Sequence, residues 1–172
     1  MKKKICIVLL MMLWAPFLYA GDASIFWNTA VDYAKRGEND FAFINFHMLV
    51  DSYPDFKKRS AAEFAMGEYY FKRNDLRSAV EEFENVYAAA PKSREALVAL
   101  AYLYKIARSE GRNDASEEYR KKMIAAHPVT FIFKDKESVQ YLSGFQRAYD
   151  VVIYIDRIEV LADGKLFVEV RD

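Results

Sequence analysis

Residues 61–91 read AAEFAMGEYYFKRNDLRSAVEEFENVYAAAP, and this stretch decides the fold. Its apolar residues recur every three or four positions from residue 62 to residue 70, and again from residue 76 to residue 86. That spacing is the period of two amphipathic helices. Asn74 and Asp75 lie between them and suit a turn followed by an N-cap. Because Pro91 cannot continue a helix, the pattern predicts a helical hairpin that ends before it.

The same pattern recurs along the chain with a period of 37 residues. Four residues of a first unit return in the second: Tyr33, Ala42, Phe46 and Pro54 return as Tyr70, Ala79, Phe83 and Pro91. Pro128 lies one further period on, and Ala115 and Tyr119 repeat the pair of small and aromatic residues one position early. A fixed period with a proline at each boundary predicts three helical hairpins, at about residues 23–56, 60–93 and 96–128.

The spacing resembles the tetratricopeptide repeat, in a protein of the exported bacterial type. Residues at five fixed offsets of the second unit agree with that family's pattern: Gly67, Tyr70, Ala79, Phe83 and Pro91. The resemblance implies a mostly α fold, an α-solenoid of three hairpins. The period exceeds the family's usual 34 residues. The third unit departs further, since Leu103 and Ile106 stand at the glycine and tyrosine positions.

The resemblance also implies a protein-binding groove on the inner face of the first helices. The residues expected to face it are Trp27, Lys35, Phe64, Glu68, Phe71, Lys72, Tyr104 and Arg108. Aromatic side chains are favoured at binding hot spots. Some family members clamp a terminal carboxylate with asparagines, but Val31 and Glu68 stand at those positions here. The alternative is that several of these side chains pack against the C-terminal tail, and the sequence leaves both open.

The first twenty residues have the layout of a secretory signal peptide. Three lysines at positions 2–4 precede an apolar run to Trp14, which is shorter than a membrane span. Small residues follow, so cleavage is predicted after Ala20 or Ala23. The mature protein is then expected in the periplasm, in contact with the membrane only through its signal. An uncleaved signal that anchors the chain in the inner membrane is the alternative. Cys6, the single cysteine, lies in this segment.

The C-terminal residues 129–172 carry a different pattern, which predicts a small β cap over the solenoid. The β-branched runs 129–133 and 150–160 suit strands. Asp163-Gly164 is a hairpin signal before a return strand at 166–170, so a hairpin is predicted over 150–171. For residues 137–149 a helix is favoured, with two short strands as the alternative. The hairpin could also expose an edge strand that recruits a partner.

Charge and motifs exclude several functions. Removal of residues 1–20 leaves 22 basic and 25 acidic residues, a poor balance for binding nucleic acid. The sequence has two histidines and no zinc-protease, phosphate-loop or nucleophile-elbow motif. It therefore predicts no enzyme, cofactor or metal. The expected function is a protein-binding scaffold that helps to assemble or position an envelope complex. The alternatives are an accessory subunit that docks through the C-terminal hairpin and, less favoured, a small enzyme with an unfamiliar site.

Overall fold

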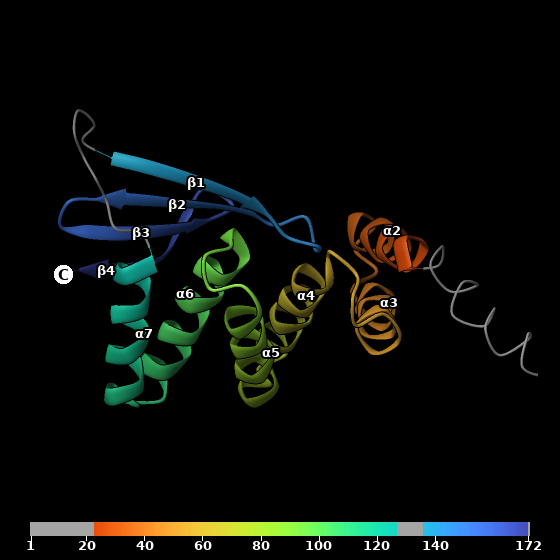
Figure 1. Cartoon of the computed structure of the whole chain (residues 1–172), viewed down its shortest axis with the longest axis horizontal. Coiled ribbons are helices and arrows are strands. Elements are labelled where there is room, and N and C mark those ends of the chain that lie inside the picture. Colours follow the sequence, from red (N-terminus) through yellow and green to blue (C-terminus); the bar gives the residue numbers. More distant parts are fainter. Residues whose placement is uncertain (1–22, 127–135, 172) are drawn as a thin grey trace, which may run out of the picture.

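The structure, a computed structural model, describes residues 23–126 and 136–171. Helices come first along the chain and strands follow (Figure 1). The helices are α2 (Ala23–Lys35), α3 (Asn39–Ser52), α4 (Arg59–Lys72), α5 (Leu76–Ala89), α6 (Arg94–Ser109) and α7 (Asn113–Ala126). The strands are β1 (Lys136–Leu142), β2 (Ala148–Tyr154), β3 (Arg157–Ala162) and β4 (Lys165–Arg171).

The six helices pack as three consecutive antiparallel pairs, which confirms the predicted hairpins. The second helices of the pairs begin at Asn39, Leu76 and Asn113, so the 37-residue period holds across all three. In the third pair the buried small residue is Ser116 rather than Ala115, which is half-buried. Ser116 lies 37 residues after Ala79, so the small position keeps the period and only the aromatic Tyr119 comes early.

Local chemistry sets the hairpin of α4 and α5 as the sequence predicted. Asn74 adopts the left-handed conformation at φ 62°, and Asp75 caps α5 by accepting a hydrogen bond of 3.2 Å from the Ser78 amide. Gly67 then lets the ring of Phe83 approach the backbone of α4. A Cβ atom at position 67 would lie 2.7 Å from Phe83 Cε1, closer than atoms can pack.

The strands form one antiparallel sheet in the order β1-β2-β3-β4, and this corrects two expectations. The predicted helix over 137–149 is wrong: β1 and a tight turn occupy it, and Val139 pairs with Val151. The single strand predicted over 150–160 is also wrong, because Ile155 and Asp156 interrupt it and separate β2 from β3. The turn at Asp163-Gly164 is confirmed, with φ values of 52° and 74°.

Three predictions fall outside the described residues. They are the signal peptide over residues 1–20, the strand over 129–133 and the boundary proline at position 128.

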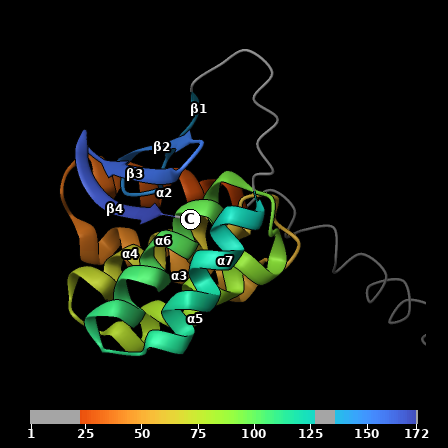
Figure 2. The ribbon, with the colours of Figure 1, turned by 90° about the vertical axis from the view of Figure 1, so that its left-hand side faces the viewer.

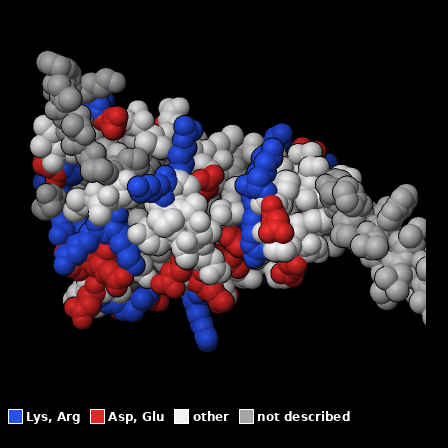
Figure 3. Space-filling view, viewed as in Figure 1, with Lys and Arg blue, Asp and Glu red and all other residues white. Residues whose placement is uncertain are grey.

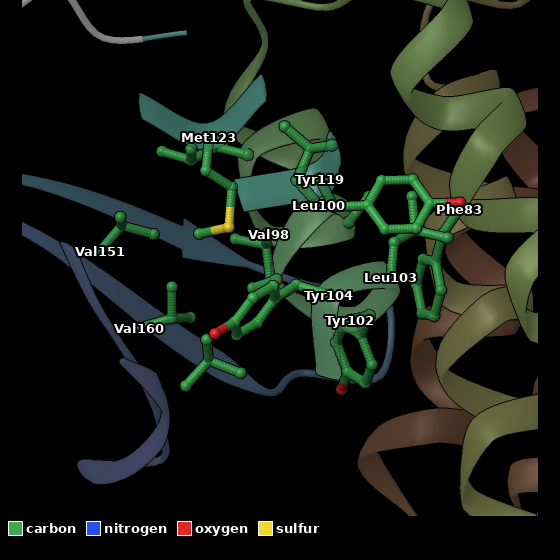
Figure 4. Close-up of a cluster of buried hydrophobic side chains, with 14 of the residues drawn as sticks. Phe83, Val98, Leu100, Tyr102, Leu103, Tyr104, Tyr119, Met123, Val151 and Val160 are labelled. Carbon is green, nitrogen blue, oxygen red and sulfur yellow. The ribbon is translucent and has the colours of Figure 1, made fainter. Parts of the chain in front are cut away.

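The sheet lies across the inner face of the helices rather than on the end of the stack, as Figures 1 and 2 both show. Its inward side chains alternate along each strand and join the largest buried cluster with α4–α7. Figure 4 shows Val151 and Val160 of the sheet beside Val98 of α6 and Met123 of α7. A second cluster lies between α2, α3 and α4, around Phe46 and Leu49.

Candidate binding surfaces

The sheet covers much of the predicted groove. Phe64 is fully buried, and its ring makes edge contacts with Tyr141 and Tyr149 at centroid distances of 5.2 and 5.9 Å. Glu68 and Tyr104 are buried as well, with exposures of 7% and 9%. Of the two arrangements that the sequence left open, the tail therefore occupies the inner face at these three positions.

The other predicted groove residues are more accessible but do not form one surface. Trp27 is half-buried against Phe46, while Lys35 is exposed beside Asp32. Arg108 is exposed and donates a hydrogen bond of 3.0 Å to the Tyr104 hydroxyl. The structure brings only Glu68, Phe71 and Lys72 together, around one pocket. A role of the eight residues in binding a partner stays a prediction.

A buried chain of hydrogen bonds fastens the sheet to the helices. Arg147 Nη1 lies 3.2 Å from the Tyr102 hydroxyl, which lies 2.5 Å from the Tyr149 hydroxyl. Tyr149 in turn donates to Glu68 Oε1 at 2.6 Å. These three hydrogen bonds join α4, α6, β2 and the turn after β1. Burial raises the pKa of Glu68 to about 7, although the hydrogen bond from Tyr149 partly opposes it.

The pocket beside this chain has a volume of about 500 Å³ and opens between α4 and two turns of the sheet. Its lining comprises Asn39, Glu68, Tyr69, Phe71, Lys72, Phe145, Gln146, Arg147 and Asp163. Most of its charge is already committed, because Arg147 Nε donates to Asp163 at 3.1 Å. Glu68 Oε2 has no hydrogen-bond partner among the described residues, but it is buried and out of contact with solvent. We therefore interpret the pocket as a space left where the sheet packs against the helices, rather than as a ligand site.

Sequence reasoning missed Tyr102, Tyr149 and Arg147. Glu68 and Tyr149 are 81 residues apart, and the residues between them belong to other elements. A tyrosine on a strand-like run looks like any packing residue, so no local signal marks the pairing.

The outer face of α3 is the surface that stands apart. Phe41, Ile44 and Met48 lie on one side of this helix, at helical spacing, with exposures of 56%, 50% and 45%. The buried side of α3, around Ala42 and Phe46, faces the other way. A helix that is apolar on both sides is usually covered on both sides.

The repeat supplies an internal comparison for this face. The positions 37 residues further on, in α5, are held by the polar residues Ser78, Glu81 and Asn85. In α7 the equivalent positions are held by Ala115, Glu118 and Lys122, none of which is a large apolar residue. Among the three helix pairs of residues 23–126, only the first therefore presents large exposed apolar side chains on its second helix, which repeat architecture does not require.

Acidic side chains border this apolar face on the side toward α4 and α5. Asp40 accepts hydrogen bonds from Tyr69 of α4 and from Arg73, the residue after α4, at 2.7 and 3.3 Å. Asp51 pairs with His47 at 2.9 Å. Burial, then the charges of Glu63 and Glu81, raise the pKa of Glu82 to about 7, with a smaller contribution from Asp51. Figure 3 shows acidic side chains gathered over the α5 side of the molecule.

The described residues contain no group of His, Cys, Asp or Glu that could hold a metal ion. Among the helices of residues 23–126, none combines the length and the apolar character needed to cross a bilayer. No protein-family model matches the sequence, and no curated protein matches it either. The fold alone defines the class: three antiparallel helix pairs, consistent with a helical repeat, followed by a four-stranded antiparallel sheet.

Proposed function

We propose that this chain is a protein-interaction module that binds a segment of another protein through the outer face of α3. The observation that carries the proposal is the contrast between Phe41, Ile44 and Met48 and the polar residues at the equivalent positions of α5. The inner face, where such a module would otherwise bind, is largely occupied by the chain's own sheet.

The energetics suit a real but reversible contact. Each of the three side chains is about half exposed. Fully burying a side chain of this size is worth about 1.5–3 kcal/mol, so covering the three would contribute about 2–4 kcal/mol. A small apolar centre with a polar surround is the usual anatomy of a protein interface.

The place of action follows from the N-terminal segment. Residues 1–20, with their basic start and apolar run, support export, so we place the module in the cell envelope. The role proposed is to assemble or position an envelope complex. We propose no catalytic role. Among the described residues, the two acids with raised pKa are Glu68, which lies in the hydrogen-bonded network under the sheet, and Glu82, which lies beside the α3 surface.

Site-specific photo-crosslinking in cells tests the proposal. A photoreactive residue at position 44 is expected to give a discrete adduct with another protein. The matched control is position 118, the equivalent exposed site in the third hairpin. Phe41→Ser with Met48→Ser should remove the adduct while the melting temperature stays within a few degrees, since exposed substitutions change stability little. Equal adducts from positions 44 and 118, or an adduct that survives the double substitution, would reject the α3 surface.

A further inference from the structure

The charge beside the apolar face indicates what kind of segment it binds. Four carboxylates lie toward α4 and α5 from this face: Asp40, Asp51, Glu81 and Glu82. Arg73 reaches Asp40, and His47 reaches Asp51. Within the described residues, no hydrogen bond or ion pair joins Glu81 or Glu82 to a cation. Arg59, the nearby guanidinium, is instead paired with the buried Glu63 at 2.8 Å.

We infer that the partner segment is a basic amphipathic helix, whose apolar side covers Phe41, Ile44 and Met48 and whose lysines or arginines meet the acidic border. This inference rests on the proposed function and names the chemistry of its partner. The apolar face and the acidic border adjoin, because Asp51 lies one turn beyond Met48 on α3.

A helix fits this surface better than an extended strand. Backbone groups within α3 are already hydrogen-bonded along the helix, so a strand would gain no main-chain bonds by lying on it. Contact must come from side chains alone. The spacing of Phe41, Ile44 and Met48 makes a ridge about two turns long, or about 10 Å, which can pack into the groove between side-chain rows of another helix.

The same charges argue against two other occupants. A second copy of this chain, packed face to face, would bring two acidic borders near each other. An anionic membrane surface attracts lysine and arginine rather than carboxylates. Burial raises the pKa of Glu82 to about 7; the charges of Glu63, Glu81 and Asp51 add to this rise, and Arg59 opposes it. A cation supplied by the partner would relieve this repulsion.

Binding of two synthetic helical peptides to the full chain tests the inference. Both carry the same leucine face, and one has lysines where the other has glutamates. By fluorescence anisotropy at low salt, the lysine peptide should bind about tenfold more tightly, and added salt should reduce the difference. Glu81→Gln with Glu82→Gln should weaken lysine-peptide binding about threefold to tenfold. Glu137→Gln, which removes an exposed carboxylate from β1, should leave it unchanged.

The outcomes separate the two proposals. If Ile44→Ser abolishes binding of both peptides but the peptides bind equally, the α3 surface stands and its basic partner is wrong. If Ile44→Ser changes neither, the α3 surface itself is wrong. Two further results would overturn the inference: tighter binding to vesicles containing anionic lipid than to the lysine peptide, or dimerisation in sedimentation that Phe41→Ser abolishes.

Discussion

Replacing Gly67 with alanine should destabilise the protein, although alanine is the better helix former. The new Cβ would lie 2.7 Å from Phe83 Cε1 and 2.9 Å from Cδ1 and Cζ. The Phe83 ring has little room to retreat, because it stacks on Tyr102 at a centroid distance of 4.5 Å and meets Phe64 at 5.4 Å. All three rings are fully buried.

The two effects can be set against each other. Overpacking of this kind costs about 1–3 kcal/mol. Alanine recovers about 1 kcal/mol over glycine in a helix interior. Since the confined Phe83 ring places the overpacking cost in the upper half of its range, at about 2–3 kcal/mol, the expected net loss is about 1–2 kcal/mol of the free energy of unfolding. This corresponds to a fall of about 2–8 °C in melting temperature.

Urea unfolding followed by circular dichroism measures this loss. Asn85→Ala, at an exposed position of α5, is the matched control and should be neutral or slightly stabilising, because only helix propensity changes. Adding Phe83→Leu removes the ring that clashes, so the double variant should lose less stability than the two single losses together. A Gly67→Ala protein as stable as the wild type, or additive losses, would refute the reasoning.

Two further predictions concern the sheet. Folding should take up a proton between pH 4.5 and 7, because burial raises the pKa of Glu68 to about 7; stability should therefore fall by about 3 kcal/mol as pH rises through this range. Glu68→Gln should remove a contribution of this size in urea titrations at several pH values and leave the part of the slope that comes from Glu82, whose pKa is also raised to about 7. An unchanged slope would contradict the role of Glu68. Gly144→Ala should loosen the turn after β1, because its Cβ would lie 2.7 Å from Phe46 Cζ and 3.0 Å from Ala65 Cβ. Amide exchange of residues 143–147 should then speed up more than exchange in α7, and uniform protection would contradict this.

The helices could be predicted because the residues that begin and end each helix lie close to it in the sequence. Asn74-Asp75 and the prolines at positions 54 and 91 act on residues a few positions away, and Gly67 lies at one of the fixed offsets of the repeat pattern. The prediction of a helix over residues 137–149 was wrong for the opposite reason: the structure of this segment depends on a distant one. Val139 and Tyr141 point inward only once β2 is paired beside them, and a short stretch with one glycine does not show that partner.

For the binding surfaces, too, features set by local sequence could be predicted and features set by distant contacts could not. Position within the repeat located the inner face, yet whether it stayed open depended on where the tail folded back. Tyr149 reaches Glu68 across 81 residues, a contact that no local spacing encodes. The outer face of α3 could have been found from the sequence alone. Aligning residues 41, 44 and 48 with residues 78, 81 and 85 shows apolar side chains in the first unit against polar side chains in the second.

The turn after β1 has a consequence for how this protein could change over evolutionary time. Gly144 sits against Phe46 and Ala65, and the Phe145 ring meets Phe46 at 5.6 Å, while the strands pack with α4–α7 in the largest buried cluster. A simple array can gain or lose a unit because each unit touches only its neighbours. Here one sheet, with the turn after β1, contacts both the first hairpin and the third. Duplicating or deleting the middle hairpin would change the distance between these two contacts, so the sheet could no longer make both. The number of helical hairpins is therefore fixed by the sheet, unlike in a simple repeat array.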